Sequence, residues 1–163
     1  MWHERRRRIR CFYAAVGLVL ASIGCKGGTE SLGDPKARLT EYISHSFSVK
    51  GAGDRDTLAG YLSGDARARL LAWSDDQFVQ AFTGTKRQFL KLAIKENKAL
   101  GENQVNITYE VTYLDQSKGQ GHSAKVTTKK LAELTKVEDK WLISEVRNIK
   151  EMIEYQNEIS FFP

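Results

Sequence analysis

The sequence is poor in side chains with metal-binding or nucleophilic chemistry. Its 163 residues include only two cysteines, Cys11 and Cys25, and both precede residue 26. The rest of the chain therefore has no material for a disulfide, a thiolate nucleophile or a cysteine-ligated zinc site. His45 and His122 are too scattered to predict a metal site. Because phosphate-loop and Gly-x-Ser-x-Gly motifs are also missing, we expect no metal and no cofactor.

Most of the chain also lacks an excess of positive charge. The formal net charge is +5, but five arginines within residues 5–10, set against Glu4, give residues 1–24 a charge of +4. Residues 25–163 therefore carry only +1. Nucleic acid is not an expected partner, because such binding requires the basic charge on the folded part. The composition, 41% hydrophobic and 28% charged, is typical of one ordinary globular domain.

The uncharged segment that precedes Cys25, residues 11–24, is short for a membrane span. Its fourteen residues would extend about 21 Å as a helix, whereas the hydrocarbon layer is about 30 Å thick. A basic segment precedes the run, and a polar, glycine-bearing stretch follows it. This layout predicts that residues 1–24 are a signal peptide, with a permanent transmembrane helix as the alternative.

The residues that end this run, Leu20-Ala21-Ser22-Ile23-Gly24-Cys25, resemble the lipobox of bacterial lipoproteins. Gly24 and Cys25 fit that pattern fully, whereas Ser22 replaces the usual aliphatic residue. The resemblance implies cleavage between Gly24 and Cys25 and acylation of Cys25, including palmitate, as the new first residue. Residues 25–34 would then be a lipidated tether that holds the protein on a membrane of the bacterial cell envelope. The alternative is an ordinary secretory signal that leaves Cys25 as a free thiol.

Residues 35–163 are expected to form one domain with helices first and strands afterwards. Asp34 before Pro35 predicts the start of one helix, and Ser74 with Gln77 forms a capping box that predicts another. From Lys86 onward the hydrophobic period changes from about 3.6 to about 2. Strands are predicted at residues 87–99, 104–115, 122–138 and 140–151. Because short turns separate them, the fold class is α+β with an antiparallel meander.

The last predicted strand does not alternate cleanly. Trp141 and Ile143 share one parity, whereas Val146 has the other, so a bulge or strong bend is expected. If the register of Trp141 persists, Glu145 and Arg147 face the helices. If the register changes, Val146 faces the helices instead.

Helices followed by a meander, with Lys140-Trp141-Leu142-Ile143 after the last turn, resemble the nuclear-transport-factor-2-like (cystatin-like) cone over about residues 35–155. The resemblance implies amino-terminal helices packed on a curved four-stranded antiparallel meander that encloses an apolar pocket. Some members use that pocket for isomerase or dehydratase chemistry, and many use the domain for binding or dimerisation. Aromatic residues with polar groups and one charged pair are the candidate pocket residues: Tyr42, Tyr61, Tyr109, Tyr113, Trp141, Glu145 and Arg147.

Two functions are compatible with these residues. The first is a non-enzymatic, membrane-anchored envelope lipoprotein that binds a partner protein or a small apolar ligand, with a homodimer as a candidate assembly. The alternative is an isomerase- or dehydratase-type enzyme in which Glu145 is the base and Arg147 favours its ionised form.

Lysines on the predicted strands are a candidate basic surface. We expect them on the outer face of the sheet, where they would meet anionic headgroups or simply remain solvated. They are Lys86, Lys91, Lys95, Lys98, Lys125, Lys129, Lys130 and Lys136.

Overall fold

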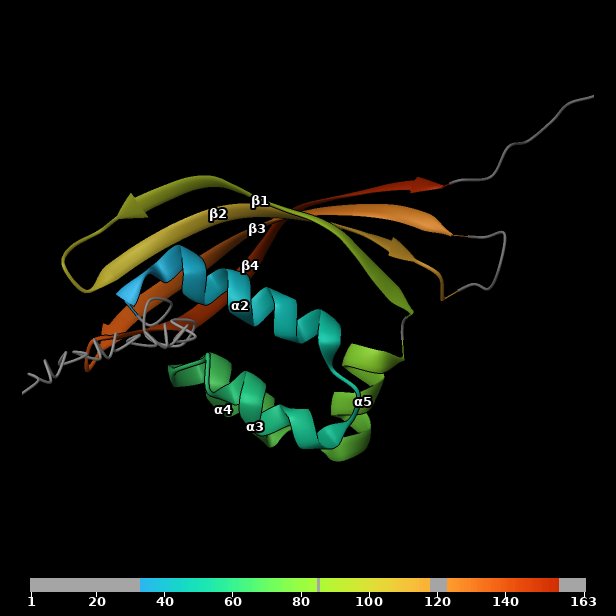
Figure 1. The fold of residues 1–163 in the computed structure, drawn as a ribbon, viewed down its shortest axis with the longest axis horizontal. Coiled ribbons are helices and arrows are strands. Elements are labelled where there is room, and N and C mark those ends of the chain that lie inside the picture. The colour runs from blue at the N-terminus through green and yellow to red at the C-terminus, as the bar shows by residue number, and fades with distance from the viewer. Residues whose placement is uncertain (1–32, 85, 118–122, 156–163) are drawn as a thin grey trace, which may run out of the picture.

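The computed structural model describes residues 33–84, 86–117 and 123–155. Helices precede strands, so the fold is α+β as predicted (Figure 1). The helical part of the described chain consists of α2 (Pro35–Ser48), the 3-10 turn η1 (Ala52–Asp54), α3 (Arg55–Ala59), α4 (Gly64–Ala72) and α5 (Asp75–Thr83). The sheet consists of β1 (Arg87–Ala99), β2 (Gln104–Asp115), β3 (Ala124–Val137) and β4 (Lys140–Tyr155).

Two helices begin at the predicted capping residues. The Asp34 carboxylate accepts a hydrogen bond from the Lys36 backbone N–H at 3.0 Å, and Pro35 follows at the first position of α2. At α5 the Ser74 hydroxyl accepts from the Gln77 backbone N–H at 3.2 Å, and the Gln77 amide oxygen accepts from the Ser74 N–H at 2.9 Å. These bonds satisfy N–H groups that have no acceptor within the helix.

The four strands form an antiparallel meander in the order β1-β2-β3-β4. A two-residue turn joins β3 to β4, and both its residues, Glu138 (φ 46°) and Asp139 (φ 63°), have left-handed backbones. Such turns match the right-handed twist of the strands they connect. The predicted sheet is therefore confirmed, with β4 extending further than expected, to Tyr155.

A register shift in β4 decides which of its side chains face the helices. Ser144 has no partner on β3, so the strand parity changes at this point. Beyond it Val146, opposite the buried Ala132, is on the inner face. Glu145 and Arg147 therefore lie on the outer face, and the predicted bulge is present.

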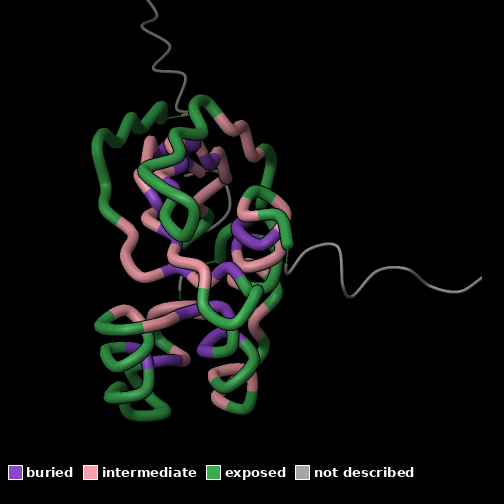
Figure 2. Tube along the Cα trace, turned by 90° about the vertical axis from the view of Figure 1, so that its left-hand side faces the viewer, coloured by how far each residue is buried: buried purple, intermediate pink, exposed green. Residues whose placement is uncertain are grey.

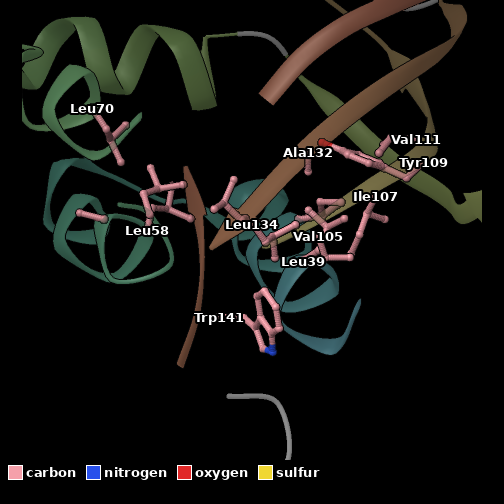
Figure 3. Close-up of a cluster of buried hydrophobic side chains, with 14 of the residues drawn as sticks. Leu39, Leu58, Leu70, Val105, Ile107, Tyr109, Val111, Ala132, Leu134 and Trp141 are labelled. Carbon is pink, nitrogen blue, oxygen red and sulfur yellow. The ribbon is translucent and has the colours of Figure 1, made fainter. Parts of the chain in front are cut away.

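The hydrophobic core lies between the inner face of the sheet and the helices. Figure 1 shows the sheet curving over α2, with α3 and α4 farther from it, and Figure 2 shows buried positions on the facing sides of strands and helices. The core cluster extends from Leu70 of α4 to Val111 of β2 (Figure 3). Each fully buried large apolar side chain contributes roughly 1.5–3 kcal/mol. The largest of them are Phe78, Leu39, Leu58, Ile107, Leu134 and Ile143.

Arg38 of α2 joins the helical layer to the sheet. Its side chain is only 9% exposed, and its Nε donates to the backbone carbonyl of Trp141 at 3.2 Å. An Nη donates to the carbonyl of Gly60, at the end of α3, and the guanidinium lies 4.0 Å from the centre of the Tyr61 ring. The Tyr61 ring therefore packs against the Arg38 guanidinium. One buried cation links α2, α3 and β4.

Backbone pairing holds the α3–α4 connection against the sheet. The Ile143 N–H donates to the Tyr61 carbonyl at 2.9 Å, and the Ser63 N–H donates to the Ile143 carbonyl at 2.9 Å. These bonds form a parallel bridge between Leu62 and Ile143. The helices are thus fixed to one edge of the sheet by hydrogen bonds as well as by apolar packing.

Candidate functional site

A cavity of about 440 Å³ lies between the inner face of the sheet and helices α2 and α5. Figure 1 shows α2 directly beneath the curved sheet and α5 beside the end of α2, and both helices contribute lining residues. Both ring and aliphatic side chains form its apolar wall. They are Tyr42, Phe47, Phe82, Tyr109, Val111 and Val146.

Ring contacts shape this wall. Phe47 of α2 lies 5.8 Å, centre to centre, from Tyr113 of β2 and 5.4 Å from Phe89 of β1. On the opposite side Phe82 packs against the fully buried Phe78 at 4.8 Å. Rings at these separations and tilts are favourable pairs. The wall is therefore held by contacts with the core.

A second, more apolar pocket of about 400 Å³ adjoins the cavity. Leu62, Leu70 and Ala66 line it from the helical side. Four residues line both spaces, namely Tyr42, Trp73, Phe82 and Val146. The two spaces are therefore neighbours that share these four side chains.

Polar and charged side chains occupy the sheet side of the cavity. Two come from cross-strand partners on β1 and β2, Arg87 and Asp115, and Thr128 and Glu151 are partners on β3 and β4. The Thr128 hydroxyl donates to the Glu151 carboxylate at 3.5 Å. A register shift at Ile149 of β4 returns Glu151 to the inner face.

Lys130 of β3 is the cation that projects from the middle of the sheet toward this cavity. It lies opposite Tyr109 on β2 and Asn148 on β4, both of which line the same space. Burial lowers the pKa of the Lys130 ammonium, and the positive charge of Arg87 lowers that pKa further, while Glu151 raises it. Desolvation is the largest of these effects, as expected for an amine facing an apolar wall.

The three tyrosines of the cavity keep their protons at neutral pH. Burial raises the pKa of Tyr109 far above its usual range, and the neighbouring Tyr42 adds to that rise. Burial also raises the pKa of Tyr42 and of Tyr113. The three phenols therefore add no charge to the cavity.

The structure brings together some of the predicted pocket residues. Tyr42, Tyr109 and Tyr113 all line the cavity. Trp141 is buried, at 9% exposure, but it belongs to the core beside α2 and does not line the cavity (Figure 3). Its carbonyl, rather than its ring, makes the specific polar contact described above, with Arg38.

The candidate pair Glu145 and Arg147 does not line the cavity. Both residues lie on the outer face because the parity of β4 changes at Ser144. Arg147 forms an ion pair with Glu133 of β3 rather than with Glu145. The inward carboxylate of β4 is Glu151, which sequence reasoning missed because two register shifts precede it.

Two lysines that were expected on the outer face lie on the inner face instead. Lys130 and Lys136 share the parity of the buried Val126, Thr128 and Ala132, and Lys136 lies opposite the buried Trp141. Lys129, next to Lys130, has the opposite parity. That inner-face spacing was visible in the sequence and could have identified Lys130 as a cavity residue.

On the outer face itself, two of the lysines have carboxylate partners. Lys95 pairs with Glu110 at 2.8 Å, and Lys125 pairs with Glu154 at 3.1 Å. The hydrogen bond from Lys95 lowers the pKa of Glu110. Exposed pairs of this kind contribute little to stability, so they mainly reduce the positive charge of the face.

Neither a metal-binding cluster nor a membrane span is found in the part of the chain that the structure describes. Within residues 33–84, 86–117 and 123–155, no three His, Cys, Asp or Glu side chains are grouped to hold a metal ion. No helix in those ranges is long and apolar enough to cross a membrane. The predicted cleavage and lipidation residues, Gly24 and Cys25, lie outside the described residues.

Comparison with known proteins identifies a similar fold and no family. No protein-family model and no curated protein matches the sequence. A SEC-C motif containing protein from Rhodopseudomonas palustris has a similar structure, with a TM-score of 0.53 and 13% identity, covering 73% of this chain and 81% of that one. A putative scytalone dehydratase from Novosphingobium aromaticivorans gives a TM-score of 0.46 and 13% identity, covering 78% and 92%. At such identities the first likeness concerns the fold alone.

Proposed function

We propose that this chain is a membrane-anchored lipoprotein of the bacterial cell envelope whose cone-shaped domain binds a small, largely apolar ligand. The observation that carries the binding function is the 440 Å³ cavity, which combines an aromatic wall with several polar and charged groups, most of them from the sheet. Cavities of this size and lining are typical of small-molecule sites. The ligand would place an apolar ring or alkyl body against Tyr42 and Phe82 and a polar group near Lys130.

A small ligand suits the cavity better than a protein partner does. The wall is concave and carries both apolar rings and polar groups, which favours a compact molecule with an apolar body and a polar group. Tyr109 and Tyr113 also line this space, and their phenols remain protonated. A partner protein or a second copy would use other surfaces of the same domain.

The anchor is proposed from the sequence at Cys25. The described domain begins directly after the predicted tether, with Asp34 capping α2. This spacing supports an arrangement in which residues 25–34 separate a lipidated Cys25 from the folded domain. Two or more acyl chains would give stable membrane attachment.

The two residues that suggested an enzyme do not lie in the cavity. Glu145 and Arg147 are on the outer face, where they supply no base to the cavity. Of the inward carboxylates, Glu151 already accepts a hydrogen bond from Thr128, and Asp115 is the cross-strand partner of Arg87. We therefore propose binding and not isomerase or dehydratase chemistry.

Benzyl alcohol is a suitable probe of the cavity, because it combines a ring with one hydroxyl. The full-length chain in phosphatidylcholine nanodiscs should transfer saturation to the ring protons of benzyl alcohol in NMR experiments. Ser46→Leu should abolish most of that transfer, since Ser46 lines the cavity and a larger side chain would fill it. Ser44→Leu is the matched control, because Ser44 is exposed on the same helix. Equal transfer with both variants would contradict binding in the cavity.

A further inference from the structure

Lys130 has an uncommon position for a lysine. Its side chain lies on the inner face of the sheet, between strands that carry Tyr109 and Asn148, and it lines the cavity. Among the described residues, its ammonium group has no hydrogen bond and no ion pair. Other lysines of the sheet, such as Lys95 and Lys125, are solvated and paired with carboxylates.

The surroundings of Lys130 favour the neutral amine. The aromatic wall removes water from the ammonium, and Arg87 on β1 adds a second positive charge nearby. Glu151 opposes this effect but is engaged by the Thr128 hydroxyl at 3.5 Å, and Asp115 is the cross-strand partner of Arg87. Desolvation and a neighbouring cation are the two conditions under which a lysine becomes a nucleophile.

We infer that Lys130 captures small aldehydes or ketones as a reversible imine, with the ring or alkyl body of the carbonyl compound held against the aromatic wall of the cavity. The inference rests on the proposed function, since it names the ligand class of the same cavity. It extends that function by assigning a covalent bond to one side chain. The geometric basis is an unpaired amine that lines a cavity large enough for the carbonyl compound.

Imine formation at Lys130 requires no oxidant or reductant. The neutral Nζ of Lys130 attacks the carbonyl carbon, and the carbonyl π electrons move to oxygen. One proton moves from nitrogen to that oxygen to give a carbinolamine. The hydroxyl is then protonated, the nitrogen lone pair expels water as the C–O bond breaks, and the resulting iminium loses its N–H proton to give the imine. Glu151, on the neighbouring strand and in the same cavity, can relay the protons in both directions.

Reductive trapping tests this inference on the full-length chain in phosphatidylcholine nanodiscs. Benzaldehyde with cyanoborohydride at neutral pH converts any imine into a stable benzyl amine, which peptide mass spectrometry locates. We expect Lys130 to be labelled about tenfold faster than Lys129, because the cavity concentrates and orients the aldehyde at Lys130. Benzyl alcohol in excess should slow labelling at Lys130 but not at Lys129.

Variants test whether the label depends on the Lys130 amine and on the cavity. Lys130→Arg keeps the positive charge but cannot form the imine, so it should lose the fast label while still binding benzyl alcohol. Ser46→Leu should slow labelling at Lys130, and Ser44→Leu should not. Equal labelling rates at Lys129 and Lys130 would overturn the inference. If benzyl alcohol still binds in that case, the proposed binding function stands, whereas loss of both signals contradicts both proposals.

Discussion

Lys129 and Lys130 are consecutive residues of β3 that lie on opposite faces of the sheet. Lys129 pairs across the strands with Glu110 on the outer face, whereas Lys130 pairs with the buried Tyr109. The sheet thus gives one lysine a solvated position and the next a position in the cavity. This pair provides a matched comparison for tests of the cavity.

Lys130 should make the stability of the domain depend on pH. The pKa of Lys130 is lowered in the folded state, so between that lowered pKa and the unfolded value of about 10.4 the unfolded chain binds more protons. Stability contributed by Lys130 therefore rises with pH across that window. Compared with Lys130→Met, the wild-type chain should gain unfolding free energy as the pH rises from about 7 to about 10.

Chemical unfolding of the full-length chain in mild detergent, at several pH values, measures this difference. Lys129→Met, measured alongside, gives the effect of removing a lysine from the outer face of the same strand. A flat difference between Lys130→Met and wild type would contradict the desolvated position of Lys130.

Arg38→Ala should destabilise the domain by about 2–4 kcal/mol. The substitution removes two charge-assisted hydrogen bonds, one of them to the carbonyl of the buried Trp141 and the other to the carbonyl of Gly60. Arg67→Ala, on the exposed side of α4, should change stability by no more than about 0.5 kcal/mol. Urea unfolding of the full chain measures both, and similar losses would argue against the link between α2 and β4.

Glu145→Gln should leave both stability and benzyl alcohol binding within error of wild type. Its side chain is on the outer face, away from the cavity. Tyr109→Ala should instead cost about 3–5 kcal/mol, as other large aromatic truncations do, because Tyr109 is only 2% exposed in the core. Thermal unfolding and NMR binding together provide the comparison. A loss of binding in Glu145→Gln would restore the enzymatic alternative.

Cys25→Ala should prevent lipid attachment and cleavage after Gly24. Thioether formation needs a sulfur at that position, so the variant should retain residues 1–24 and carry no acyl chain. Mass spectrometry of the membrane fraction of bacteria that express the full-length chain gives both masses. Ser22→Ala is the control and should still be processed. A wild-type protein found unmodified in the soluble fraction would contradict the anchor.

Local signals made most of the fold predictable. The caps at Asp34 and Ser74 depend on residues only two or three positions away, and the strand positions follow from alternation. The register of β4 was harder to predict. The bulge at Ser144 changes which side chains of the strand face the helices, and no distinctive residue marks its position.

The cavity could be predicted only in part. Alternation along β2 placed Tyr109 and Tyr113 on one face, and both line the cavity. Lys130 was grouped with the lysines of the outer face, although its parity indicated the inner one. Nothing local marks the role of Arg38, since its acceptors lie 22 and 103 residues away in sequence.

The central claim is that the cone cavity binds a ligand with its polar end at Lys130. A crystal structure of the full-length chain grown with benzyl alcohol tests it most directly. The account predicts ring density against Tyr42 and Phe82, with the hydroxyl directed toward Lys130. An empty cavity, or benzyl alcohol bound only on the outer face of the sheet, would contradict it.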